Sequence, residues 1–167
     1  MGERLTQSDV DKIKAEIEDR SVNLRPKLLE DLKEARAQGD LSENFEYYAA
    51  KRANNQNNSR IRYLERMLKN ATIISDEPVS EGAVSINDLV TIYSIEDDEE
   101  EVIKLVTSIR SDSQNNKISI ESPLGSAVRG HKVGDVVTIQ VTSDYSYDVE
   151  IRKIEPSGDD DDRIAQY

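Results

Sequence analysis

The sequence lacks cysteine altogether, so its 167 residues offer neither disulfide bonds nor thiolate ligands for a metal. A chain without cysteine is suited to a reducing compartment. No apolar run approaches the roughly 18 to 20 residues that cross a bilayer, and the opening residues MGERLTQSD lack the apolar stretch of a signal peptide. These absences predict a cytoplasmic protein with no membrane partner.

The motifs that support nucleophilic catalysis are also missing. The single histidine lies in the turn-like Gly130-His131-Lys132, where an exposed loop residue is expected rather than a base or a metal ligand. The sequence also has no glycine-rich phosphate loop and no nucleophile elbow. We therefore do not expect a self-sufficient enzyme.

The net charge of −12 would ordinarily argue against a role near nucleic acid. The charge is uneven, however: residues 1–77 hold 14 Lys and Arg against 15 Asp and Glu, whereas residues 78–167 hold 8 against 19. Within the first part, the stretch 51–69 carries six basic residues and one acidic residue. The acidity of the second part therefore says little about the partners of the first.

The composition changes near Asp76-Glu77-Pro78. Ala, Leu, Glu, Lys, Arg and Gln dominate before this point, and short runs of Val, Ile, Thr and Ser follow it. The change predicts an α+β protein. We expect a long antiparallel coiled-coil hairpin at residues 1–76, a linker at 77–83 and a compact β-rich domain at 84–167.

Apolar residues before the boundary recur at helical spacing and predict a long first helix. Thr6 is its expected N-cap, and Pro26 predicts a kink or restart near residues 23–25 because a proline inside a helix removes a hydrogen bond. The apolar stripe comprises Val10, Ile13, Ile17, Leu24, Leu28, Leu32 and Ala35.

A second stripe predicts the returning helix of the hairpin. It comprises Ala50, Asn54, Asn57, Ile61, Leu64, Leu68 and Ala71. Gly39 is expected to follow the end of the first helix, and a link this short makes the two helices antiparallel. The asparagines within residues 54–58 indicate either a polar seam that sets the register or a locally loose helix.

The second domain is expected to contain five strands and one short helix. A charged turn at 95–101 is expected between the first two strands. The acidic tail at 158–162 is interpreted as solvated because no calcium-binding loop is complete there. The expected strands are 89–95, 102–108, 117–122, 135–141 and 147–154, and the helix is 124–128.

Two carboxylates, Asp40 and Glu43, lie at the link between the predicted helices. On spacing alone, Asp-x-x-Glu favours a capping box in which Asp40 is the N-cap of the returning helix. The alternative is that the pair holds a divalent metal. Two ligands are too few for Mg²⁺, which takes about six oxygens, so a metal role requires a partner that completes the site.

The residues around this link resemble the tip signature of the bacterial Gre transcript-cleavage factors, in particular the GreA branch. The resemblance extends over nearly the whole chain, and it implies a C-terminal domain with a prolyl-isomerase-like fold. The residues that carry it are Gly39-Asp40-Leu41-Ser42-Glu43-Asn44-Phe45-Glu46-Tyr47, Ala49-Ala50-Lys51, Arg25-Pro26, Ala71-Thr72-Ile73-Ile74, Ser122-Pro123-Leu124-Gly125-Ser126-Ala127 and Lys132-Val133-Gly134-Asp135.

The resemblance implies that the hairpin enters the secondary channel of a backtracked RNA polymerase. Asp40 and Glu43 would then help to hold an Mg²⁺ ion shared with the polymerase and orient the attacking water, which stimulates the polymerase's own cleavage of the RNA. The isolated protein would bind no metal. Ser42, Asn44 and Tyr47 are expected to support the tip.

Further roles follow from the same resemblance. Lys51, Arg52 and Arg60 are predicted to face the phosphates of the nascent RNA 3′ end, although an ordinary solvated helix face is an equal alternative. The segment Arg129, Gly130, His131 and Lys132 is predicted to contribute to docking on the polymerase. We expect a monomer.

Two other functions remain open at this point. An anti-cleavage paralogue would occupy the channel and inhibit transcription, although such proteins tend to carry a more heavily acidic tip. A coiled-coil adaptor would use the tip residues only as a cap.

Overall fold

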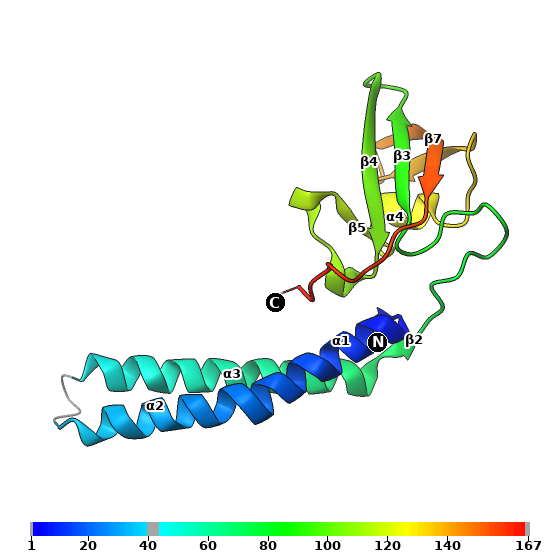
Figure 1. The fold of residues 1–167 in the computed structure, drawn as a ribbon. Coiled ribbons are helices and arrows are strands. Elements are labelled where there is room, and N and C mark those ends of the chain that lie inside the picture. The colour runs from blue at the N-terminus through cyan, green and yellow to red at the C-terminus, as the bar shows by residue number, and fades with distance from the viewer. Residues whose placement is uncertain (1, 40–43, 166–167) are drawn as a thin grey trace. The chain divides into compact units, whose positions relative to one another are not determined.

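The chain folds as a helical unit and a sheet unit (Figure 1). The computed structural model describes residues 2–39 and 44–165. The helical unit contains Gly2 and Asp9–Ala71, and the sheet unit contains Glu3–Ser8 and residues 72–165. The predicted α+β fold, with a helical hairpin before a β-rich domain, is confirmed.

The first arm of the hairpin consists of three helical segments. Helix α1 (Gln7–Glu18) continues into a π-helical segment, η1 (Asp19–Leu24), and then into α2 (Arg25–Ala37). Pro26 lies in the first turn of α2, where a missing N–H costs least. The predicted restart of the helix near residues 23–25 is confirmed: the π-helical segment η1 ends at Leu24, and α2 begins at Arg25.

The returning arm is one continuous helix, α3 (Phe45–Asn70). Its buried face mixes apolar and polar side chains, and the helix packs along α2. The predicted stripe included part of this face but missed Arg60 and Met67. The buried residues of α3 are Asn57, Arg60, Ile61, Leu64 and Met67.

Two asparagines of α3 form the polar seam that the sequence indicated. Asn57 accepts a hydrogen bond from Arg20 Nη1 at 3.0 Å and donates to the Arg20 carbonyl at 3.1 Å. Asn58 accepts from Arg25 Nε at 3.1 Å. These bonds join α3 to the segment around η1, so they fix the register of the two arms where the first arm changes its helical pitch.

The sheet unit is built on five strands in the order β5-β4-β3-β7-β6 (Figure 1). The β4–β5 pair is parallel, and the other neighbours are antiparallel. Strand β4 begins three residues before the predicted start at 102, so the carboxylates expected in a turn belong partly to the sheet. The strands are β3 (Leu89–Ser94), β4 (Glu99–Val106), β5 (Lys117–Ser119), β6 (Val136–Gln140) and β7 (Ser146–Glu155).

Alternating apolar residues of these strands form a single core against helix α4 (Pro123–Val128), which covers one face of the sheet. Val128 of α4 is fully buried in this core. The chain enters and leaves the core through loops that carry its polar residues. The core comprises Val84, Ile86, Val90, Ile92, Ile103, Leu105, Ile120, Val128, Val137, Ile139, Val149 and Ile151.

A second, two-stranded sheet was not predicted. Strand β1 (Arg4–Leu5) pairs in parallel with β2 (Thr72–Ile73), so the residues before α1 belong to the sheet unit. The helical unit consequently ends at Ala71, earlier than the expected boundary after residue 76. Within residues 2–39 and 44–165, none of the helices combines the length and apolarity needed to span a membrane.

Candidate functional site at the distal end of the hairpin

The two helices of the hairpin end in well-defined caps around residues 40–43. Gln38 closes α2, and Gly39 follows it with φ +118°, which agrees with its predicted place after the helix. The N-cap of α3 is Asn44, whose side-chain oxygen accepts a hydrogen bond from the Tyr47 N–H at 3.0 Å. The expectation that Asp40 is this N-cap is therefore wrong.

Asn44 also joins α3 to α2. Its side-chain Nδ2 donates to the carbonyl oxygen of Ala35 at 2.7 Å, and Ala35 is itself buried. The guanidinium of Arg36 lies 5.6 Å from the centre of the Tyr47 ring, within the range of a cation–π contact. We call Ala35, Arg36, Asn44 and Tyr47 the distal clamp. The distal clamp ties together the two chain segments that flank residues 40–43.

Three of the predicted tip residues, Asp40, Ser42 and Glu43, lie outside the described residues. Asn44 and Tyr47, which were predicted to support the tip, are brought together by the distal clamp. Among the residues that the structure describes, no three His, Asp or Glu side chains gather closely enough to hold a metal ion.

An aromatic surface lies beside the distal clamp. Phe45, the first residue of α3, is 85% exposed, and Tyr48 is also exposed. The Tyr48 ring meets the ring of Tyr47 edge to face, with centroids 5.4 Å apart. The exposed phenyl ring of Phe45 gives the end of the hairpin an apolar contact surface.

The three basic residues predicted to face RNA differ in exposure. Lys51 and Arg52 are exposed on α3. The side chain of Arg60 is only 8% exposed, and its Nε donates to Glu16 at 2.8 Å. Because this guanidinium is directed into the hairpin, the structure contradicts the expectation that Arg60 faces phosphates.

Glu16 connects the two arms electrostatically. It accepts hydrogen bonds from Arg20 and from Arg60, each through Nε at 2.8 Å. Burial alone would raise the pKa of Glu16, but the hydrogen bonds from Arg60 and Arg20 outweigh burial and lower it. The carboxylate is therefore held in its charged form between the arms.

The predicted docking segment 129–132 forms the loop after α4. Arg129 is half-buried, and burial together with the nearby charge of Arg4 lowers its pKa. Gly130 donates its N–H to the Val84 carbonyl at 2.9 Å, which attaches the loop to the core. Its φ of +87° is a conformation that glycine adopts more readily than other residues.

Asp135 fastens the exposed end of this loop. Its carboxylate accepts the backbone N–H of Lys132 at 2.9 Å and lies 3.1 Å from His131 Nδ1. The bond from the Lys132 N–H and the contact with His131 lower the pKa of Asp135. Both His131 and Lys132 are exposed, as the sequence predicted for His131. The loop thus presents two basic side chains on a fixed backbone.

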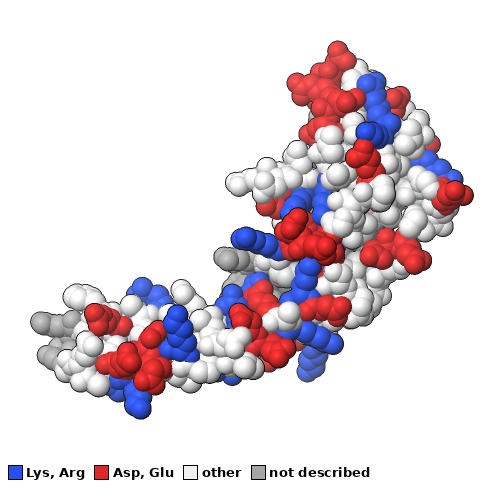
Figure 2. Space-filling model, in the orientation of Figure 1, with Lys and Arg blue, Asp and Glu red and all other residues white. Residues whose placement is uncertain are grey.

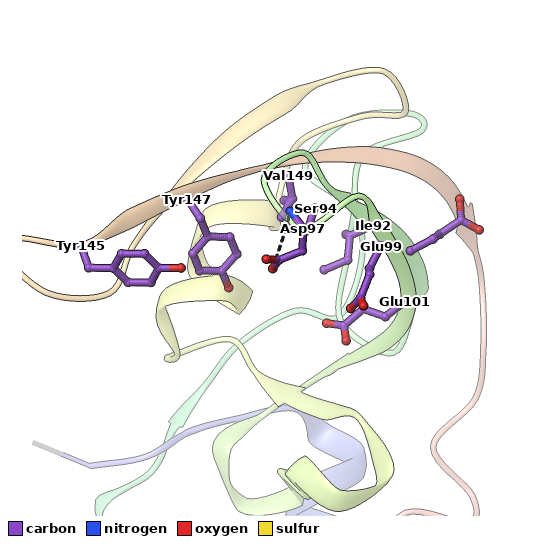
Figure 3. A pocket seen from close by; sticks show the side chains of 9 residues that line it. Ile92, Ser94, Asp97, Glu99, Glu101, Tyr145, Tyr147 and Val149 are labelled. Carbon is purple, nitrogen blue, oxygen red and sulfur yellow. Dashed lines mark hydrogen bonds between the residues drawn. The ribbon is translucent and has the colours of Figure 1, made fainter.

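The sheet unit also carries an acidic hollow, shown in Figure 3, with a volume of about 210 Å³. Tyr145 and Tyr147 line one side and stack with centroids 6.0 Å apart. Glu99 and Glu101 lie opposite them (Figure 3). Acidic side chains gather over the end of the sheet unit where β3 joins β4, whereas acidic and basic side chains alternate over the hairpin (Figure 2).

Family models match both parts of this chain. The N-terminal model of the transcription elongation factors GreA and GreB matches residues 3–73, and the C-terminal GreA/GreB model matches residues 79–156. The chain belongs to the GreA/GreB family of transcription elongation factors. The resemblance seen in the sequence is thereby confirmed, and transcription elongation is the function shared by its family.

Individual members of the GreA/GreB family match over most of their length. Transcription elongation factor GreA of Chloroherpeton thalassium is 42% identical over 82% of this chain and 87% of its own. GreA of Streptococcus pneumoniae is 41% identical over 90% and 94%. Among solved structures, the GreA factor homolog 1 (Gfh1) protein of Thermus thermophilus is 23% identical and covers 93% of this chain and 99% of its own, with a TM-score of 0.43.

Sequence reasoning about this GreA/GreB family member missed two residues of the distal clamp, Ala35 and Arg36. Ala35 acts through its carbonyl oxygen, which every residue possesses, so its side chain gives no signal. Arg36 could have been noted as a basic residue in the last turn of α2, beside an aromatic residue near the start of α3.

Proposed function

We propose that the hairpin enters the secondary channel of RNA polymerase and stimulates the polymerase's own cleavage of backtracked RNA, which rescues arrested complexes. Asp40 and Glu43 would act at the reacting phosphodiester, and the polymerase would perform the hydrolysis. The proposal is supported by membership of the GreA/GreB family together with the caps of the hairpin.

The observation that carries the proposal is the N-cap at Asn44. On spacing alone, Asp40 and Glu43 were explained by a capping box, which would account for both residues without any further role. Asn44 already caps α3, and it also bonds to Ala35 of α2. Asp40 is therefore not the N-cap of α3, and this supports a chemical role for the two carboxylates.

The chemistry follows from the number of ligands. Carboxylate oxygens are the ligands that Mg²⁺ prefers, but two residues fill only part of its shell of about six oxygens. Asp40 and Glu43 would therefore complete a site that the polymerase and its RNA supply in part. An ion at that site polarises the phosphodiester and lowers the pKa of bound water. The two carboxylates would hold the water in line, with Ser42 as a further hydrogen-bond partner.

The described residues supply the supporting parts of the proposal. The distal clamp would hold the ends of the 40–43 segment at a fixed separation while it is inserted. Lys51 and Arg52, which are exposed on α3, would attract the phosphates of the extruded RNA 3′ segment without sequence preference. Segment 129–132 would contribute basic side chains to docking on the polymerase as a monomer.

A cleavage assay on stalled elongation complexes tests the proposal. Complexes with labelled RNA and Mg²⁺ are incubated with the wild-type chain or with Asp40→Ala/Glu43→Ala. We expect shortened RNA with the wild type only. The control is Asp31→Ala/Glu34→Ala, which removes two exposed carboxylates from α2 and should cleave like the wild type.

Two results would overturn the proposal. Cleavage by the folded Asp40→Ala/Glu43→Ala variant at the wild-type rate would remove the role of the carboxylates. If the wild type instead slowed both cleavage and elongation, the chain would be an inhibitor that occupies the channel.

A further inference from the structure

The C-terminal tail, residues 157–165, lies outside the segment that the C-terminal family model matches. The tail has no helix or strand, yet it returns to the sheet unit after β7 (Figure 1). The side chain of Asp162 is only 1% exposed. The interpretation of residues 158–162 as a solvated acidic end is therefore wrong for Asp162.

Three cationic side chains surround the Asp162 carboxylate. Lys104 Nζ lies 2.9 Å from Oδ2, Arg110 Nη1 lies 2.7 Å from Oδ2, and Lys117 Nζ lies 2.8 Å from Oδ1. We call these three residues the cationic site. The Asp162 carboxylate is thus bound by all three cations at once.

The cationic site is built by residues that precede the tail. Lys104 and Lys117 are register partners on the parallel strands β4 and β5, and like charges placed opposite each other are unfavourable without an anion between them. The Arg110 side chain is fully buried, and its Nη1 also donates to Asn87 at 2.8 Å. The backbone positions of the three cations are therefore set by elements that precede the tail, and Asn87 also holds the Arg110 side chain.

The tail is recognised as a peptide as well as an anion. Lys104 Nζ donates to the Gly158 carbonyl at 2.6 Å, and the Ala165 N–H donates to the Ile109 carbonyl at 2.6 Å. A small oxyanion such as phosphate could replace the carboxylate, but it lacks the backbone N–H that donates to the Ile109 carbonyl. A cavity of about 470 Å³ lies beside this contact, lined in part by Arg110 and Lys117.

We propose that Lys104, Arg110 and Lys117 form a binding site for acidic peptides, which the chain's own tail occupies and which an acidic segment of another protein takes when the tail detaches. The ligand places one carboxylate among the three cations and a backbone N–H three residues later against the Ile109 carbonyl. The proposal concerns the sheet unit alone and does not depend on cleavage stimulation by the hairpin.

The nature of the contacts allows the tail to detach. It forms no strand with the sheet, and the contacts that hold it include polar groups at Gly158, Asp162 and Ala165. The tail and a peptide in solution would therefore compete for the same three cations.

The test is a binding measurement with a labelled peptide that has the sequence of residues 156–165. Its affinity for three full-length chains is measured by fluorescence anisotropy: the wild type, Asp162→Asn and the control Asp161→Asn. Since a tethered tail competes at an effective concentration in the millimolar range, Asp162→Asn should bind the peptide about tenfold more tightly than the wild type. Asp161 is exposed, so its variant should behave like the wild type.

Two further variants test the same site independently of Asp162→Asn. Ala165→Pro removes the N–H that bonds to Ile109 and should open the site from the other end of the tail, even if Asp162→Asn folds poorly. Adding Lys104→Met to either opened chain should abolish the gain in affinity.

The proposal is overturned if neither opened chain binds the peptide more tightly than the wild type. It is also overturned if inorganic phosphate displaces the peptide more strongly than chloride at equal ionic strength, because the site would then recognise an oxyanion and not a peptide. A peptide that carries asparagine at the position of Asp162 should show no preference for the opened chains.

Discussion

Replacing Asp162 with asparagine should lower the free energy of unfolding of the sheet unit by about 2.5 kcal/mol near neutral pH. Burial alone would raise the pKa of Asp162, but the hydrogen bonds from Lys117, Lys104 and Arg110 outweigh burial and lower it from 3.8 to about 2. Each pKa unit corresponds to about 1.4 kcal/mol, which gives the expected loss.

The loss should depend on pH in a defined direction. Because the pKa of Asp162 is lower in the folded chain than in the unfolded chain, the carboxylate stabilises the fold fully above the unfolded value of 3.8. This stabilisation disappears as the pH falls through the folded value of about 2. The stability difference between the wild type and Asp162→Asn should therefore be constant between about pH 6 and pH 8 and shrink below about pH 4.

Urea unfolding of the full chain, followed by amide signals of β3 and β4, measures this difference in the sheet unit alone. Asp161→Asn removes the same charge from an exposed position and should change the free energy of unfolding by less than about 0.5 kcal/mol. A difference between the two variants below that value at pH 7, or one that persists unchanged at pH 2, would refute the argument.

Three further variants test the hairpin. Asn44→Ala should cost about 1 kcal/mol and speed hydrogen exchange of the Tyr47 amide, whereas Asn44→Asp should retain the cap. Arg60→Met should lower the thermal midpoint of the helical signal at 222 nm, because the half-buried Glu16 carboxylate then keeps only Arg20 as a partner. An unchanged midpoint would contradict the inward placement of Arg60. Lys51→Ala/Arg52→Ala should reduce the slope of log affinity for arrested complexes against log salt by about 1.4, and Arg60→Met should leave that slope unaltered.

The helical unit was predictable because its signals are local. Apolar residues that recur with a period near 3.6 indicate a helix, and this pattern involves residues only a few positions apart. Pro26 likewise predicts the restart of the first arm at α2. Arg60 was misjudged because its burial depends on Glu16 in the other arm. A basic residue on a mostly polar helix gives no local indication of which face it occupies.

Two features of the sheet unit could not be predicted, because they depend on residues far apart in the sequence. Four successive aspartates at 159–162 look alike in the sequence, and Asp162 is the one that the structure shows paired with Lys104, Arg110 and Lys117. That choice depends on Lys104 and Arg110, which lie 58 and 52 residues earlier. The β1–β2 pair was missed for the same reason, since two-residue strands carry no periodicity and their pairing joins distant parts of the chain.

The π-helical segment η1 has a consequence for changes in chain length. Each residue of an α-helix turns the chain by about 100°, so deleting one residue from α2 would rotate everything beyond it. The wider turn of a π-helix accommodates one additional residue, so a deletion at Val22, which is exposed within η1, could restore an ordinary helix with the later faces unchanged. Pro26 would then lie inside a regular helix and clash with the carbonyl four residues earlier. Deletion at Val22 should thus be tolerated only together with Pro26→Ala, so the position of the proline and the length of the first arm depend on each other.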